Sequence, residues 1–278
     1  MDALVETEWL AANIDARDLR VVDATWRLPG DGGEPRTDFD AAHIPGAVFL
    51  DLAEIVDSAN AAPMMLPRPE KFASRMAALG LGDGTRIVLY DDSSLHSAAR
   101  AWVMLRSFGT PDVATLDGGL AKWRAEGRPL SSEKPTPRPR HVTPRIRGEG
   151  IRDLADLRAN LDSDAAQVLD ARSPARFAGE EPEPRAGVVP GHIPGSINLP
   201  YTRFFDEDGT WKHGTSLRAV FADAGVDLNR PIVATCGSGV TASVIAFAAH
   251  LLGRDAAVYD GSWGEWGADP STPKATGA

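Results

Sequence analysis

Short apolar runs alternate with helix-like segments along the chain. Six runs have the near-continuous apolar character of strands in a parallel sheet that is buried on both faces; they are residues 21–25, 86–90, 113–116, 167–171, 232–235 and 256–260. Residues 69–80, 97–109 and 241–252 between them are predicted helices, and Gly80 and Gly253 stand where two of these helices stop. Strands that alternate with helices predict βαβ units and an α/β fold with doubly wound domains.

This pattern occurs twice in the same order. HIPGAVFLDL (43–52) matches HIPGSINLP (192–200), and VATLDGGLAKW (113–123) matches AAVYDGSWGEW (256–266). Since the repeat unit spans about half the chain, it indicates a duplicated domain rather than a solenoid. We expect one domain over residues 1–130 and a second over 149–278. The proline-rich stretch 131–148 between them is expected to be a linker, either solvated or lying along an acidic surface.

Composition limits the partners of this chain. Its 278 residues carry 29 basic and 39 acidic side chains, a net charge of −10, which opposes binding to nucleic acid or to an anionic membrane. The N-terminus has acids where a secretory signal has bases, and no apolar stretch is long enough to span a bilayer. A single cysteine excludes an internal disulfide and a thiolate-rich zinc site. We expect a cytoplasmic protein, monomeric or weakly dimeric.

That cysteine, Cys236, lies in the stretch ATCGSGVTAS, between an apolar run and a predicted helix. A strand that ends at Thr235 and a helix that starts near Val240 would turn the backbone N–H groups of the glycine-rich loop toward the sulfur. Such donors, together with the positive end of a helix dipole, favour the thiolate. Cys236 is therefore a candidate nucleophile, and the alternative is a small buried hydrophobic residue.

Tyrosine phosphatases and arsenate reductases also place a cysteine before a short loop and a helix. They use the pattern C-x5-R, in which the arginine binds the oxyanion. The sixth residue after Cys236 is Ala242, so this chain lacks the required cation.

The duplicated α/β halves, the two HIPG turns and the segments CGSGVT and YDGSWGEW resemble the rhodanese superfamily of sulfurtransferases in its two-domain form. CGSGVT is similar to the loop of the members that use 3-mercaptopyruvate, whereas thiosulfate-using members have basic residues where this chain has Gly237 and Ser238. The resemblance implies two tandem domains with mainly parallel sheets, and a persulfide that forms on Cys236. The outer sulfur of this persulfide is then transferred to a thiol such as thioredoxin, or to cyanide. No metal and no organic cofactor are implied.

The resemblance also implies roles for particular residues. Arg176 and Arg185 map onto the arginines that bind the mercaptopyruvate carboxylate and ketone; on spacing alone they could instead pair with Glu180, Glu181 or Glu183, and Arg172 is a weaker candidate. Ser238 is expected to help deliver a proton. The substrate-binding loop is expected to comprise Gly237, Ser238, Gly239, Val240 and Thr241.

His43 maps onto a histidine that is proposed to act with this serine and an upstream acid, either Asp31 or Asp38 if one is present. The same HIPG turn recurs at His192, where this role does not apply. The alternative is therefore that both histidines only cap their turns.

The first half carries Asp91 at the position of Cys236, so we expect that half to be catalytically silent. His96 and Arg100 are expected at the surface or in helix packing. Trp123, Trp263 and Trp266 lie in the paired segments DGG-x3-W and DGSWGEW; Trp263 is expected in the core or between domains, and the alternative is that it lines the pocket. Three functions stay open: 3-mercaptopyruvate sulfurtransferase, thiosulfate sulfurtransferase, and a noncatalytic binding module.

Overall fold

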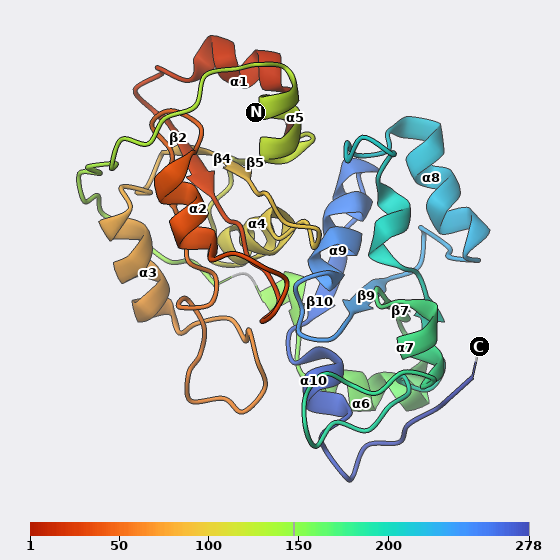
Figure 1. The fold of residues 1–278 in the computed structure, drawn as a ribbon. Helices are drawn as coiled ribbons and strands as arrows, with labels where there is room; N and C mark the ends of the chain where they lie inside the picture. Colours follow the sequence, from red (N-terminus) through yellow and green to blue (C-terminus); the bar gives the residue numbers. More distant parts are fainter. Residues whose placement is uncertain (147, 278) are drawn as a thin grey trace. The chain divides into compact units, whose positions relative to one another are not determined.

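The computed structural model describes residues 1–146 and 148–277, which form two compact units. Unit 1 consists of residues 1–56, 67–146 and 205–211, and unit 2 consists of residues 57–66, 148–204 and 212–277. Each unit has its own five-stranded sheet with helices on both faces (Figure 1). No helix among the described residues combines the length and the apolar character that are needed to cross a bilayer.

The sheet of unit 1 has the strand order β1-β5-β4-β2-β3, and all its pairs are parallel. The strands are β1 (Leu4–Val5), β2 (Leu19–Asp23), β3 (Val48–Phe49), β4 (Arg86–Tyr90) and β5 (Val113–Leu116). The helices are α1 (Thr7–Asn13), α2 (Pro35–Ala41), α3 (Pro69–Ala78), α4 (Ala98–Ser107) and α5 (Gly119–Ala125). Helix α4 packs on β4 and β5, while α1 and α5 are joined by a 2.6 Å hydrogen bond from Thr7 to Glu126.

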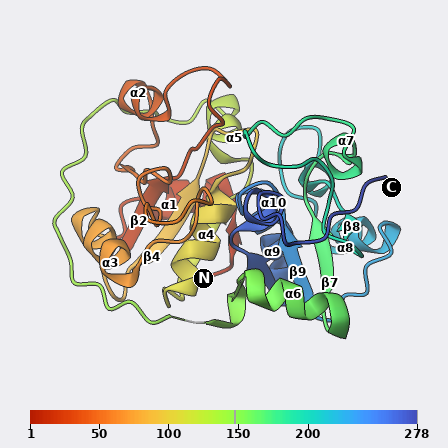
Figure 2. The same cartoon turned by 90° about the horizontal axis from the view of Figure 1, so that it is seen from below.

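The sheet of unit 2 repeats this order as β6-β10-β9-β7-β8, again with parallel pairs. Its strands are β6 (Ile151–Arg152), β7 (Gln167–Asp170), β8 (Ile197–Asn198), β9 (Ile232–Thr235) and β10 (Ala256–Tyr259). Its helices are α6 (Leu154–Ser163), α7 (Pro174–Ala178), α8 (Gly214–Asp223), α9 (Ala242–Leu251) and α10 (Ser262–Trp266), with 3-10 helices η1 (Gly148–Gly150) and η2 (Tyr201–Phe204). Figure 2 shows β7 and β9 side by side, as their pairing requires.

The predicted α/β class, with two domains that each have a parallel sheet, is confirmed. Strands of four or five residues overlap all six predicted runs, because apolar runs of that length are buried on both faces of a parallel sheet. The predicted core position of Trp263 is confirmed as well. Trp123, Trp263 and Trp266 are all fully buried, and the indole N–H groups of Trp123 and Trp266 donate to the carbonyls of Pro129 and Pro273.

The compact units differ from the predicted division into 1–130, 131–148 and 149–278. Residues 131–146 belong to unit 1, where backbone hydrogen bonds hold them along its surface. The N–H of Arg140 donates to Ala77 at 3.1 Å, and that of Arg145 donates to Phe108 at 2.8 Å. This stretch is therefore a docked segment rather than a free connector.

Each unit also includes a short segment from the other half of the sequence. In unit 2, the N–H of Leu66 donates to the Asp260 carboxylate at 2.7 Å. In unit 1, the N–H of Trp211 donates to the Asp117 carboxylate at 2.9 Å. The aspartate of the repeated DG motif thus has the same role in both units. It accepts a hydrogen bond from the backbone of the segment that comes from the other half of the sequence.

Candidate active site

Cys236 directly follows β9, the central strand of the sheet of unit 2, and precedes α9, whose N-cap is Thr241. Its sulfur is buried and accepts hydrogen bonds from the N–H groups of Gly239 at 3.1 Å and Ser238 at 3.5 Å. Gly239 has a φ of +81°, in the left-handed region that glycine adopts without strain. The loop therefore turns two amide donors toward the sulfur, which stabilises negative charge on it.

Helix α10 fixes the position of this loop. The N–H of Trp263 donates to the carbonyl of Cys236, and the N–H of Gly264 donates to that of Gly237, each at 2.9 Å. A Cβ at position 264 would lie only 2.8 Å from the carbonyl oxygen of Gly237. Glycine at 264 is thus what allows the helix to approach the loop so closely.

Ser262 is a site residue that the sequence reasoning did not identify. Its hydroxyl accepts the N–H of Cys236 at 3.2 Å and donates to the carbonyl of Tyr259 at 2.8 Å. The residue is fully buried and has a φ of +50°, which is uncommon for serine. The equivalent residue in unit 1 is Gly119, with a φ of +55°. The change from DGG in the first repeat to DGS in the second was the available signal.

We expect Ser262→Gly to lower kcat/KM for sulfur transfer about fivefold, because the Cys236 N–H loses its acceptor while the backbone conformation stays allowed. A hydrogen bond of this kind contributes about 1 kcal/mol. Steady-state kinetics would measure the loss. Ser216→Ala, which removes an exposed hydroxyl in the same unit, is the matched control. An unchanged kcat/KM in Ser262→Gly would show that this bond does not position the nucleophile.

A buried ion network lies behind the cysteine. The guanidinium of Arg172 contacts Asp170 at 2.7 Å and Glu183 at 2.7 Å, and it lies 4.8 Å from the ring centre of Trp263. Burial alone would lower the pKa of Arg172, but Asp170, Glu183 and Cys236 together raise it above its ordinary value. Arg172 therefore stays positively charged in this buried network.

Arg176 lies close to the cysteine loop. Its Nη2 contacts Glu183 at 2.5 Å, so the ion pair that spacing alone allowed is present. The same Nη2 lies 3.3 Å from where a Cβ at position 237 would stand. Its Nε is buried and has no hydrogen-bond partner among the described residues. Glu183 is thus shared between Arg172 and Arg176, and Arg176 keeps a free N–H donor.

Arg185 follows in an exposed loop of the same unit. Its Nη1 lies 3.5 Å from where a Cβ at position 264 would stand, beside the helix that holds the cysteine loop. The structure thus brings Arg176 and Arg185 to the two segments that hydrogen-bond one another, the loop at Gly237 and the helix at Gly264.

Among the other predicted site residues, Ser238 and Thr241 are half-buried, whereas Gly239 and Val240 are buried. His43 belongs to unit 1, where it is fully buried and its Nδ1 donates to the carbonyl of Phe39 at 2.7 Å. His192 makes the same bond to Phe177 at 2.8 Å, and each histidine ring stacks on that phenylalanine. Both HIPG histidines therefore pack their turns, and a catalytic role for His43 stays a prediction.

The upstream acid that was considered for His43 has its own partner. Asp38 forms an ion pair with Arg27 at 2.5 Å, and Asp31 is exposed. Neither acid is hydrogen-bonded to the Nδ1 of His43, since that atom bonds a backbone carbonyl.

Comparison with known proteins identifies the family to which the two repeated domains belong. Residues 6–126 and 153–269 each match the family described as the rhodanese-like domain. The chain therefore belongs to the rhodanese family, with two tandem copies of the domain, and the predicted resemblance is confirmed.

The similar proteins include sulfurtransferases of two kinds. The chain is 44% identical over 271 residues to human 3-mercaptopyruvate sulfurtransferase, which covers 95% of this chain and 91% of the relative. It is 42% identical over 272 residues to thiosulfate sulfurtransferase from Cricetulus griseus, with the same coverage. Among solved structures, SseA from Escherichia coli, described as having the rhodanese fold, matches with a TM-score of 0.86 and 37% identity over 95% of this chain and 99% of SseA.

Proposed function

We propose that this chain is a 3-mercaptopyruvate sulfurtransferase, which moves a sulfur atom from 3-mercaptopyruvate to a thiol or to cyanide and releases pyruvate. One arrangement carries the proposal: a sulfur that accepts two amide hydrogen bonds stands in a loop flanked by two arginines. The identity to the human enzyme over nearly the whole chain supports the same reaction.

In the first half-reaction, the Cys236 thiolate attacks the sulfur of 3-mercaptopyruvate. A bond forms between the two sulfurs as the carbon–sulfur bond of the donor breaks, and its electron pair leaves on pyruvate as the enolate. The thiol proton of the donor ends on the enolate carbon, with Ser238 as the proposed relay. The product on the enzyme is a persulfide anion, which the N–H groups of Ser238 and Gly239 stabilise as they stabilise the thiolate.

In the second half-reaction, an acceptor thiolate or cyanide attacks the outer sulfur of the persulfide. The sulfur–sulfur bond breaks, and Cys236 leaves as a thiolate that the same two N–H groups receive. Both half-reactions therefore use one site, and every step is a displacement at sulfur. A small protein dithiol of the thioredoxin type is the proposed acceptor, and a reducing compartment such as the cytoplasm is the proposed setting, because Cys236 must remain a free thiol.

The two arginines suit an α-keto acid donor. A guanidinium binds a carboxylate with paired N–H donors, and the unpartnered Nε of Arg176 is one such donor. The loop residues Gly237 and Ser238 are uncharged, so the positive charge near the sulfur comes from Arg176 and Arg172 instead. Thiosulfate is the second candidate donor, because thiosulfate sulfurtransferases are almost as similar to this chain.

The donor preference tests the proposal directly. With cyanide as acceptor, we expect kcat/KM for thiocyanate formation to be at least about tenfold higher with 3-mercaptopyruvate than with thiosulfate, a difference of about 1.4 kcal/mol in transition-state binding. A preference for thiosulfate would instead assign the second function. A protein that forms no persulfide with either donor would be a noncatalytic binding module.

Basic residues in the loop are expected to shift this preference. In the double variant Gly237→Arg, Ser238→Lys, the new side chain at 237 starts 3.3 Å from Nη2 of Arg176 and must displace it. We expect the ratio of kcat/KM for mercaptopyruvate over thiosulfate to fall about tenfold, since the carboxylate loses its partner while thiosulfate gains cations. The double variant Thr215→Lys, Ser216→Lys, two exposed changes in the same unit, adds the same two positive charges and controls for net charge. An unchanged ratio would show that the loop does not select the donor.

A further inference from the structure

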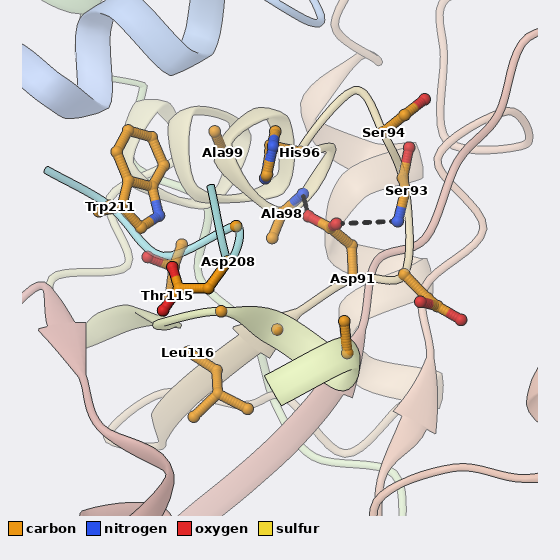
Figure 3. A pocket seen from close by; sticks show the side chains of 15 residues that line it. Asp91, Ser93, Ser94, His96, Ala98, Ala99, Thr115, Leu116, Asp208 and Trp211 are labelled. Atoms are coloured by element: carbon orange, nitrogen blue, oxygen red, sulfur yellow. Dashed lines mark hydrogen bonds between the residues drawn. The ribbon is translucent and has the colours of Figure 1, made fainter. Parts of the chain in front are cut away.

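Unit 1 contains a cavity of about 250 Å³ at the carboxyl ends of β4 and β5. Its walls come from the loop after β4, the start of α4, the loop after β5 and the segment 205–211. Figure 3 shows Trp211 and Thr115 on one side of this cavity and Asp91 and Ser93 on the other. Asp91 follows β4 as Cys236 follows β9, so the cavity occupies the position in unit 1 that corresponds to the sulfur site of unit 2.

The carboxylate of Asp91 fills the amide nest of this loop. It accepts hydrogen bonds from the N–H of Ser93 at 3.1 Å and from that of Ala98 at 2.6 Å. Burial, followed by the charges of Asp23 and Asp92, raises the pKa of Asp91 to about 7, although the two N–H groups oppose this. The nest therefore already contains its own anion and has no place for a second one.

The lining of the cavity is acidic and includes no lysine or arginine. Asp91, Asp92 and Asp208 contribute acids; Asp92 is paired with Arg124 at 2.7 Å. Burial lowers the pKa of His96 to about 4, so that side chain is neutral. Ionised Asp91 thus has no cationic side chain in the cavity wall.

The contrast with unit 2 explains this excess of negative charge. Asp170 of unit 2 is the counterpart of Asp23, and Arg172 two residues later neutralises it at 2.7 Å. Unit 1 has Thr25 in place of that arginine, and Thr25 and Tyr90 give Asp23 only uncharged hydrogen-bond donors, among them the N–H of Thr25 at 2.9 Å. The carboxylates of Asp23 and Asp91 therefore repel one another, and the guanidinium that neutralises Asp170 in unit 2 has no counterpart at position 25 of unit 1.

The opposite wall offers a polar atom and aromatic surface. Thr115 is 2% exposed, and its hydroxyl has no hydrogen-bond partner among the described residues. A buried hydroxyl without a partner costs free energy, and a bound N–H donor would remove this cost. His96 stacks on Phe205 with ring centres 3.4 Å apart, and Trp211 packs against the same ring at 4.4 Å.

We propose that this cavity binds a small organic cation, a primary ammonium group on a short carbon chain. The ammonium group pairs with Asp91 and donates to the Thr115 hydroxyl, and the carbon chain packs on Trp211 and on the alanines at the start of α4. A lone metal ion would leave most of this volume and its apolar lining unused. The site is independent of the sulfur chemistry proposed for Cys236.

Binding of n-butylammonium, with uncharged n-butanol as the matched ligand, tests this site. In NMR spectra, the amide signals of Ser93 and Ala98 report the ionisation of Asp91 because both groups donate to it. Without ligand we expect a titration midpoint near pH 7. Saturating n-butylammonium should lower this midpoint by about one pH unit, which corresponds to about tenfold tighter binding by ionised Asp91, whereas n-butanol should not move it. Affinity should therefore rise as pH increases through 7.

Variants separate this site from other charges near Asp91, which include Asp23, Asp92, Asp208 and His96, together with Arg124 through Asp92 and Lys122 through Asp208. Thr115→Val removes an unpartnered hydroxyl and should weaken n-butylammonium binding about fivefold in a folded protein. Asp91→Asn should abolish both the titration and the pH dependence, and Asp18→Asn, an exposed change outside the cavity, should alter neither. An unmoved midpoint, equal effects of the two ligands, or full affinity in Thr115→Val would each overturn the proposal.

Discussion

Replacing Cys236 with serine is expected to abolish sulfur transfer from every donor, a loss of about a thousandfold or more in kcat. A serine hydroxyl is too weakly acidic to become the nucleophile and cannot carry a persulfide. The small side chain still fits between the N–H groups of Ser238 and Gly239, so the melting temperature should change by no more than about 4 °C. Thiocyanate formation and a thermal melt measure the two effects.

Mass spectrometry gives this prediction an independent reading. The wild-type protein should gain the mass of one sulfur atom when it is treated with 3-mercaptopyruvate, and Cys236→Ser should gain none. Because Cys236 is the only cysteine of the chain, a gain in the variant, or turnover near the wild-type rate, would place the sulfur acceptor at a residue other than cysteine.

Arg176→Gln is expected to lower kcat/KM for 3-mercaptopyruvate about 100-fold, or about 2.7 kcal/mol. The change removes the guanidinium that faces Gly237 and leaves Glu183 with Arg172 alone. Truncating one partner of a close charge pair typically costs 2–5 kcal/mol. Steady-state kinetics with both donors would show a smaller loss for thiosulfate, since that donor has no carboxylate.

Arg158→Gln is the matched control for this variant, because Arg158 pairs with Asp269 on the surface of the same unit. Its kcat/KM should stay within about twofold of wild type, as expected for an exposed ion pair. Arg176→Lys should fall between wild type and Arg176→Gln, since lysine keeps the charge but not the paired donors. Equal losses in Arg176→Gln and Arg158→Gln would contradict a specific role for Arg176.

The sequence predicted the architecture because the signals for it are local and occur twice. Buried parallel strands of four or five residues give apolar runs such as RIVLY, which is β4 in the structure. Strands β1, β3, β6 and β8 were not predicted, since two residues are too few to form a recognisable pattern. Conserved order between the two halves was enough to indicate two sheets with the same topology.

Around the candidate site, the sequence identified residues whose role depends on their own loop. Cys236 and its glycines were found because the strand, loop and helix are contiguous in the chain. Ser262 was missed because its contact with Cys236 spans 26 residues, and the change from DGG to DGS between the repeats does not show which residue the serine contacts. The alternatives for Arg176 could not be separated either, since its contacts with Glu183 and with the loop at Gly237 exist together in the folded chain.

The sequence by itself determined the fold class, the duplication and the position of the candidate nucleophile at the end of a strand. Only the tertiary structure decided that segments 57–66 and 205–211 join the opposite units, that Glu183 is shared between two arginines, and that unit 1 encloses an acidic cavity. The reason is physical. Strand formation and loop curvature depend on neighbouring residues, whereas ion pairs, close approaches and cavities depend on residues that meet only when the chain packs.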